Sequence, residues 1–333
     1  MSLFSNGNAR VVSRLPARVI SIVAFAGFAL SCDAQDRSTP LPRGGSAKEV
    51  AIAGAVVMIG AGDIAQCNNN GDELTAVLVD SLLKADSAAG VENVVFTMGD
   101  NAYPSGAQGS RDTFGRCFQP SWGTKRIMDV IRPSPGNHDF ENVLGKGYYG
   151  YFGDKAGPPN KGWYSYDIGK WHIISLNSEI LFRREFQSLI NEQQNWLRDD
   201  LKKNSKKCTM AYWHRPLFSS GWHGESDQTQ SFWNILYENG ADLVVNGHEH
   251  DYERFLPQTP IGVPDSVRGI EEIVAGTGGA ELRAFRSRLA PNSEVQIAGH
   301  NGVLKLTLGD EEYRHVFIDV QGRLWDEGGR KCH

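Results

Sequence analysis

The sequence has no run of basic residues and no surplus of positive charge. Its 34 Lys and Arg residues are outnumbered by 39 Asp and Glu residues, which gives a formal net charge of −5. A protein that binds nucleic acid needs a basic stripe or patch to meet the phosphate backbone. The composition therefore argues against nucleic acid as a partner.

Long apolar runs are also missing. The run Val19 to Leu30 is too short to cross a bilayer as a helix. It is preceded by basic residues, which is typical of a secretory signal, so residues 1–32 are predicted to be a signal peptide. The basic residues are Arg10, Arg14 and Arg18.

The predicted signal ends at Cys32, in a context that resembles a bacterial lipoprotein processing site. Lipidation of Cys32 and simple cleavage nearby both stay open. Residues 33–50 are rich in Pro, Gly, Ser and Arg and predict a flexible linker. We therefore expect an exported protein, in the bacterial periplasm, in the cell envelope or secreted, with membrane contact only through a lipid on Cys32.

Cysteine is scarce, with five residues in the chain and no CxxC pair. The absence of that pair argues against a structural zinc site. Apart from Cys32 there are four, an even number, and an exported chain meets an oxidising compartment, so two disulfides are predicted. Four cysteines allow three pairings. We favour Cys67 with Cys117, in loops near the polar clusters described below, and Cys208 with Cys332, which would pin the C-terminal tail.

Neither internal repeats nor a linker interrupt the chain after residue 50, so residues 51–333 are predicted to be one domain. Apolar, strand-like runs alternate there with amphipathic, helix-like stretches, which indicates an α/β fold. The predicted strands are Ala55–Ile59, Val94–Met98, His172–Leu176, Met210–Trp213 and Leu243–Asn246. The predicted helices are Glu73–Ala85, Ser188–Lys203 and Thr229–Asn239.

What the sequence does have is five short polar clusters, each directly after a strand-like run. Their carboxylate, amide, phenol and imidazole groups are hard and borderline metal ligands, and no thiolate is among them. Ligands in α/β proteins bind beyond the carboxyl ends of strands. We therefore predict a two-metal hydrolytic site. The clusters are Gly62-Asp63, Gly99-Asp100-Asn101-Ala102-Tyr103, Gly136-Asn137-His138-Asp139, Trp213-His214 and Gly247-His248-Glu249-His250.

Glycine precedes the proposed ligand in four of these clusters, where a residue without Cβ permits a sharp turn and a close backbone approach. In an extended segment, residues two apart point the same way, so His248 and His250 are expected to reach adjacent metals while Glu249 points away.

These motifs resemble those of the calcineurin-like metallophosphoesterases, and within them the purple acid phosphatase branch and its bacterial relatives. The resemblance spans roughly residues 51 to 330. It implies a single catalytic domain of two stacked mixed β-sheets flanked by helices, a four-layer α/β/β/α fold. The strand-like runs at 270–275, 303–308 and 315–320 are expected to complete the second sheet.

One position departs from the superfamily pattern. Members usually carry His two residues after the first Asp, whereas Asp63 is followed by Ile64 and Ala65. Tyr103, three residues after Asp100, has the spacing of the tyrosine that binds a ferric ion in purple acid phosphatases. A phenolate is a hard anionic donor that favours Fe(III).

The resemblance therefore implies two metal ions, Fe(III) plus a divalent ion (Zn, Mn or Fe), bridged by Asp100. The implied ligands are Asp63, Asp100, Tyr103 and His250 for the first metal, and Asp100, Asn137, His214 and His248 for the second.

The implied activity is that of an acid phosphatase: hydrolysis of small phosphomonoesters by attack of a metal-bound hydroxide, with an optimum below neutral pH. His138 and His223, outside the ligand set, resemble the histidines that supply the leaving group's proton. Two alternatives stay open. One is a phosphodiesterase or nucleotidase with the same site, and the other is a non-catalytic metal- or phosphate-binding envelope protein.

Some neighbouring residues carry weaker predictions. The turn at Gly276 to Gly279 lacks the Lys-Ser/Thr ending of a nucleotide-binding P-loop and is expected to line the cleft. Asp139 and Asp251, beside predicted ligands, are expected to orient imidazoles. Arg254 either holds an acidic side chain or touches phosphate.

Overall fold

The computed structural model describes residues 55–106, 113–141 and 144–333. The predicted signal peptide, the linker and Cys32 lie outside these residues, so their predictions stay as such. No helix in the described part is both long enough and apolar enough to cross a membrane.

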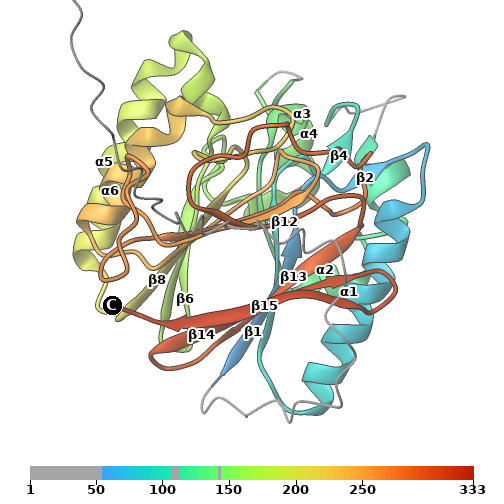
Figure 1. Ribbon diagram of the computed structural model, residues 1–333. Coiled ribbons are helices and arrows are strands. Elements are labelled where there is room, and N and C mark those ends of the chain that lie inside the picture. Colours follow the sequence, from blue (N-terminus) through green and yellow to red (C-terminus); the bar gives the residue numbers. More distant parts are fainter. Residues whose placement is uncertain (1–54, 107–112, 142–143) are drawn as a thin grey trace, which may run out of the picture. The chain divides into compact units, whose positions relative to one another are not determined.

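Two mixed β-sheets form the centre of the described domain (Figure 1). The six-stranded sheet has the order β15-β14-β13-β1-β3-β5, and the seven-stranded sheet has the order β12-β10-β11-β9-β8-β7-β6. The strands of the first are β1 Val56–Ala61, β3 Asn93–Met98, β5 Ile131–Ser134, β13 Gly302–Leu308, β14 Glu312–Asp319 and β15 Leu324–Lys331. Those of the second are β6 Tyr164–Ile168, β7 Trp171–Ser175, β8 Cys208–Trp213, β9 Leu243–Asn246, β10 Tyr252–Phe255, β11 Glu271–Ala275 and β12 Ser293–Ile297.

Helices cover the outer face of each sheet, and the two main groups lie on opposite sides of the strands in Figure 1. A short parallel pair, β2 Ala65–Gln66 and β4 Ala102–Tyr103, lies apart from the two sheets. The α-helices are α1 Gly71–Ala88, α2 Lys125–Val130, α3 Asn137–Phe140, α4 Lys146–Phe152, α5 Gln187–Lys203 and α6 Gln230–Glu238. Within the described residues, single turns of 3₁₀- or π-type lie at Phe114–Phe118, Gly153–Ala156, Glu179–Phe182, Arg184–Phe186 and Asp227–Thr229.

Alternation along the central strands accounts for the four layers. In β1, Val56 and Met58 belong to the core between the sheets, whereas Val57 and Ile59 pack with Val79 of α1 on the outer face. Successive side chains of a strand point to opposite faces, so a strand covered on both faces is apolar throughout. On the far side α5 and α6 pack on the second sheet in the same way. The predicted α/β/β/α fold is confirmed.

The predicted strands and helices all form, with shifts of a few residues at their ends. The prediction that the late strands complete the second sheet is wrong for two of the three. Only β11 joins that sheet, beside β9. β13 pairs antiparallel with β1, and β14 pairs with β13, so both extend the first sheet. Both sheets face one core, so the apolar pattern of a strand does not say which sheet it joins.

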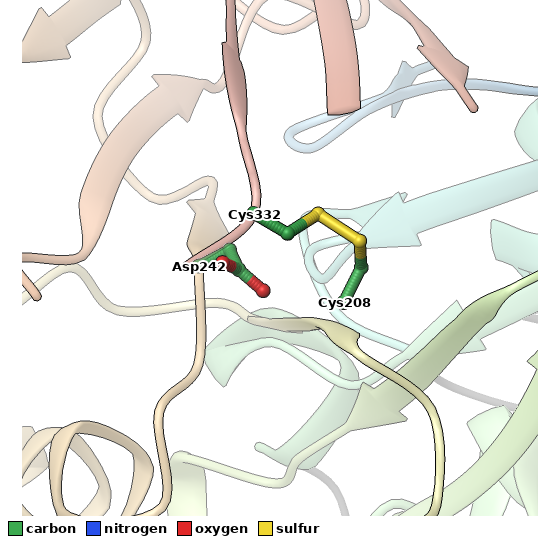
Figure 2. A group of neighbouring side chains, drawn as sticks. All are labelled: Cys208, Asp242 and Cys332. Carbon is green, nitrogen blue, oxygen red and sulfur yellow. A yellow bond between two sulfur atoms is a disulfide. The ribbon is translucent and has the colours of Figure 1, made fainter. Parts of the chain in front are cut away.

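The four remaining cysteines form the two favoured disulfides, Cys67–Cys117 and Cys208–Cys332, with Cα–Cα distances of 4.9 and 5.4 Å. Figure 2 shows the second bridge beside the Asp242 carboxylate. That carboxylate accepts the Thr209 N–H at 2.8 Å and the His333 N–H at 2.9 Å. The start of β8 and the C-terminal tail are thus joined both by a covalent bond and through a shared acceptor.

Candidate metal centre

The five polar clusters meet where strands of both sheets end. β1, β3 and β5 run parallel, as do β8 and β9, so their carboxyl ends lie on one side of the domain. All seven predicted ligands follow one of these strands. Asp63, Asp100, Tyr103 and Asn137 come from the first sheet, and His214, His248 and His250 come from the second.

The turns that carry these ligands pack too closely for a side chain on the preceding glycine. A Cβ on Gly136 would lie 2.2 Å from both the amide nitrogen and Oδ1 of Asp100. A Cβ on Gly247 would lie 2.6 Å from the Met98 carbonyl oxygen and 2.8 Å from Asp63 Oδ2. The predicted reason for glycine at these positions, a close backbone approach, therefore holds.

Three of the predicted ligands adopt left-handed backbone conformations: Asp63 with φ 59°, Asp100 with φ 49° and His248 with φ 73°. Such conformations cost about 1–3 kcal/mol each and concentrate at functional sites, where the surroundings enforce them. His248 and His250 therefore reach the cluster through a turn, and the extended segment expected for them is wrong. Glu249 does point away, since its carboxylate accepts the N–H groups of His223 and Gly224 at 2.9 and 2.6 Å.

The predicted ligands of the first metal surround the Tyr103 hydroxyl. This group donates to Asp63 Oδ1 at 2.8 Å or to Asp100 Oδ2 at 3.0 Å, and it lies 3.3 Å from His250 Nε2. His250 Nε2 is also 3.3 Å from Asp63 Oδ1. All four side chains are buried. Tyr103 thus lies among the predicted ligands of the first metal, and its replacement of the superfamily's histidine stays a prediction.

The predicted ligands of the second metal surround His214 Nε2. This atom lies 3.1 Å from Asn137 Oδ1, 3.1 Å from His248 Nδ1 and 3.3 Å from Asp100 Oδ2. Asp100 therefore contacts both groups through the same oxygen, as a bridging ligand would. Asn137 is the only member of the set that is not fully buried.

Backbone carbonyls fix the orientation of two of the imidazoles. His214 Nδ1 donates to the Met98 carbonyl at 2.8 Å, and His250 Nδ1 donates to the Glu281 carbonyl at 2.5 Å. In the neutral imidazole that binds a metal, Nε2 is then the unprotonated nitrogen, and in both residues it faces the cluster. Carbonyl-oriented imidazoles of this kind are usual in metal sites.

The charges of the cluster favour bound cations. Burial would raise the pKa of Asp63, but His250 outweighs it, and the carboxyl's pKa falls below its usual value. Burial likewise opposes ionisation of Asp100, but its neighbour His214 lowers the pKa of Asp100 strongly. Burial raises the pKa of Tyr103 well above its usual value, and the charges of Asp100 and Asp63 add to that effect.

The donor set fits two ions. One ligand atom each from Asp63, Asp100 and His214 lies within 4.8 Å of the others, a grouping suited to a metal ion. The remaining groups add a phenol, an amide oxygen and two imidazoles. Such oxygen and nitrogen donors suit iron, zinc or manganese. The structure brings all seven predicted ligands together, and their assignment to particular ions stays a prediction.

His138 lies beside this cluster and is partly open to solvent, with 31% of its side chain exposed. Its Nδ1 donates to the Pro104 carbonyl at 2.6 Å, and its ring packs against Tyr103 with centroids 4.5 Å apart. Its Nε2 is 3.9 Å from Asp100 Oδ2 and is directed toward the predicted metals. This position is suited to proton transfer.

His223 has both ring nitrogens occupied. Its Nδ1 donates to the His248 carbonyl at 3.1 Å, and its Nε2 accepts from Arg283 Nη1 at 2.5 Å. The ring stacks on His248 with centroids 4.3 Å apart and an interplanar angle of 24°. His223 is therefore placed over a predicted ligand, but its transfer of a proton requires Arg283 to leave Nε2.

Asp139 and Asp251 have roles other than those expected, whereas Arg254 holds acidic side chains, one of the two roles expected for it. Asp139 accepts the backbone N–H groups of Asn101 and Gly136, so it holds the ligand loops instead of an imidazole. Asp251 orients no imidazole, because both of its carboxylate oxygens are buried without a hydrogen bond in the described part of the chain. Arg254 pairs with Asp326 at 2.7 Å and with Glu294, which gives it a structural role.

Sequence reasoning missed two arginines at the centre. Arg215 pairs with Glu179 and donates to His248 Nε2 at 3.0 Å. Arg283 contacts His223 from the loop after the glycine turn. The sequence did carry a signal for Arg215, which is its position directly after the predicted ligand His214. Arg283 is 60 residues from His223, and nothing in the local sequence marks that contact.

A family model for the calcineurin-like phosphoesterases matches residues 59–252, which is more than half of the chain and contains every predicted ligand. The chain belongs to the calcineurin-like phosphoesterase family. Among curated proteins, acid phosphatase type 7 of mouse (Mus musculus) is 28% identical over a region that covers 74% of this chain. The chain spans about three fifths of that relative, 62% of its length.

Solved structures share the fold of this calcineurin-like phosphoesterase. Purple acid phosphatase PPD1 from yellow lupin (Lupinus luteus) seeds matches with a TM-score of 0.65 and 19% identity, over 83% of this chain and 54% of that one. GAP50, titled the anchor in the inner membrane complex of Plasmodium, matches with a TM-score of 0.64 and 17% identity, over 84% of this chain and 89% of that one. At these identities the likeness concerns the fold alone.

Proposed function

We propose that the protein is a metal-dependent phosphatase that hydrolyses small phosphomonoesters. The observation that carries the proposal is the Tyr103 hydroxyl within 3.0 Å of both Asp63 and Asp100, beside an imidazole of the opposite sheet. Family membership and the names of the relatives, acid phosphatase and purple acid phosphatase, support the class of reaction.

For the metals we infer Fe(III) at the Tyr103 position and Zn, Mn or Fe as the divalent partner. The Tyr103 hydroxyl lies beside two carboxylates, and a phenolate at this position would be a hard anionic donor. Such a donor favours a trivalent ion over a softer divalent one. When bound, the two ions would hold the phosphate and lower the pKa of water at the site.

The residues of the chain would divide the remaining work. His138 is placed to give a proton to the leaving oxygen, because Pro104 fixes its ring and Nε2 is free to face the substrate. The Asp100 carboxylate accepts the His138 N–H at 2.8 Å, and this hydrogen bond would hold it in position between the two ligand groups.

A test of the metal assignment is the visible absorption spectrum and metal content of protein purified without chelator. We expect an absorption band from Tyr103 bound to Fe(III), and its loss in Tyr103→Phe, together with hydrolysis of p-nitrophenyl phosphate that is faster below neutral pH. A colourless protein that holds only zinc or manganese, yet hydrolyses the ester, would disprove the ferric assignment and keep the phosphatase. Absence of both metal and turnover would disprove both.

A test of catalysis is His138→Ala. Loss of a general acid lowers turnover by about 10² to 10⁴, and we expect this loss with the metal content unchanged. His300→Ala, a remote histidine packed on Trp325, is the matched control. A wild-type protein that binds metal but shows no turnover would favour the non-catalytic alternative. Activity on bis-p-nitrophenyl phosphate in the same assay decides between phosphomonoesterase and phosphodiesterase.

We also propose export, directed by residues 1–32. The two disulfides support an oxidising compartment, because such bonds rarely persist in a reducing cytosol. Fractionation of bacteria that express the full chain tests this proposal, and protein found only in the cytosol would contradict it. Labelling of the wild type and of Cys32→Ser with a fatty acid shows whether Cys32 carries a lipid.

A further inference from the structure

We propose that Arg283 binds a second anionic group on the substrate, so that the preferred substrates are phosphomonoesters that carry a further phosphate. This inference rests on the proposed phosphatase function and adds a specificity-determining residue to it.

The loop that carries Arg283 is fixed to the centre by its backbone. After the glycine turn, the N–H of Ala280 donates to the Asp63 carbonyl at 2.9 Å, and that of Arg283 donates to the His250 carbonyl at 3.0 Å. Both acceptors belong to predicted ligands. Further along, the N–H of Arg286 donates to the Ser220 carbonyl at 2.9 Å. The α-carbon of Arg283 is therefore held beside the metal site.

The guanidinium of Arg283 lies one imidazole away from the predicted ligands. Its Nη1 is 2.5 Å from His223 Nε2, and the His223 ring stacks directly on His248. The His223 and His250 rings have centroids 6.2 Å apart.

Arg283 has no carboxylate partner among the residues that the structure describes, and neither does Arg286, whose guanidinium donates to the Trp222 carbonyl at 3.1 Å. Arg215 and Arg254, by contrast, each pair with an acidic side chain. A neutral imidazole nitrogen is a weaker acceptor than a carboxylate or phosphate, so Arg283 can exchange His223 for an anionic ligand.

The bound metals would repel an unpaired guanidinium at this position. An anion that lies between the guanidinium and the metals, or beside them, would offset this repulsion. The planar guanidinium group matches the geometry of a phosphate. The reacting phosphate would lie on the metals themselves. Because the His223 ring separates Arg283 from the predicted ligands, the group that Arg283 can reach is a second anion on the leaving-group side.

The experiment compares two substrates that differ by one phosphate, fructose 1,6-bisphosphate and fructose 6-phosphate. For the metal-loaded protein we measure kcat/KM on each and take the ratio. In Arg283→Gln we expect the ratio of bisphosphate to monophosphate to fall about tenfold or more, as for the loss of one charge-assisted contact. Arg283→Lys should recover part of it. Arg288→Gln, which removes an equal charge from an exposed position on the same loop, should retain the wild-type ratio.

Binding gives a readout that does not depend on turnover. By calorimetry, Arg283→Gln should weaken binding of propane-1,3-diphosphonate about tenfold more than binding of propylphosphonate. An equal loss for both ligands, or no loss for either, would overturn the role of Arg283. If the wild type hydrolyses neither these sugar phosphates nor p-nitrophenyl phosphate, the proposed phosphatase function fails, and the phosphonate comparison still decides whether Arg283 binds the second anion. Circular dichroism of each variant excludes misfolding as the cause.

Discussion

His172 is a buried histidine held by two carboxylates at the start of β7, far along the strand from the metal centre. Its Nδ1 and Nε2 are each 2.8 Å from a carboxylate oxygen, of Asp167 and Asp200 respectively. Burial would lower the pKa of the imidazole, but the two carboxylates outweigh it and raise the pKa above its usual 6.5. The sequence predicts a strand that begins at His172 but no partner for its imidazole.

The raised pKa of His172 predicts a pH-dependent contribution to stability. The charged imidazole stabilises the fold fully below the unfolded pKa of about 6.5, and this contribution is lost as the pH rises through the folded pKa. Urea denaturation should show that His172→Gln lowers the free energy of unfolding by about 1 to 2 kcal/mol at pH 5.5, and by less at pH 9.

The matched control for His172 is His300, whose pKa is lowered by burial. Its contribution to stability is lost as the pH falls, so His300→Gln should show the opposite trend with pH. Equal effects of His172→Gln at both pH values would contradict the role of the ion pairs.

Individual residues of the site differed in how far the sequence could predict them. The ligands were predictable from the sequence, because each follows a strand and most follow a glycine. Their side-chain types also limit the chemistry that they can perform. The partners of Asp139 and the contact between Arg283 and His223 were not, because they depend on where a distant loop is placed. Those contacts are set by tertiary packing and leave no mark in the local pattern.

At the scale of elements, β9 formed with the predicted bounds, Leu243–Asn246, because a short apolar run between polar turns has little alternative. The partner of a strand is decided differently. β13 has the same apolar alternation as a strand of either sheet. After β12 of the second sheet ends at residue 297, the chain crosses to the first sheet, where β13 pairs with β1. Local sequence therefore predicted the elements but not which sheet two of them joined.

The strand β15 leads into a tail that is bonded to the other sheet, because Cys332 follows it and Cys208 begins β8. The bond closes a separation of 124 residues. Removing such a disulfide typically costs about 2 to 5 kcal/mol. We expect the double variant Cys208→Ser, Cys332→Ser to lose stability in this range in urea denaturation.

Reducing agent provides the control for the disulfide variant. If the bond is the cause, the difference between wild type and variant should shrink once a dithiol reductant is added. A difference that persists unchanged under reduction would instead point to the packing of the two side chains.

For the molecule as a whole, each predicted ion takes ligands from both sheets. The first joins Asp63 to His250 across the sheets, and the second joins Asn137 to His214. A ligand that binds only the folded state stabilises it. We therefore expect a chelator to lower the melting temperature by several degrees, and addition of Fe and Zn to restore it. An unchanged melting temperature after complete metal removal, verified by metal analysis, would contradict the assigned centre.

The two sheets are thus fastened at both ends of β8, by the disulfide at Cys208 and by the ligand group at His214. Between these points, Phe96 of β3 packs edge-on against Tyr212 of β8, with ring centroids 5.4 Å apart. Phe96 lies four residues before Asp100, and Tyr212 lies two before His214. The volume of these two aromatic rings therefore helps to set the separation of the predicted ligands, so the geometry of the centre can be tuned by buried side chains that never meet a substrate.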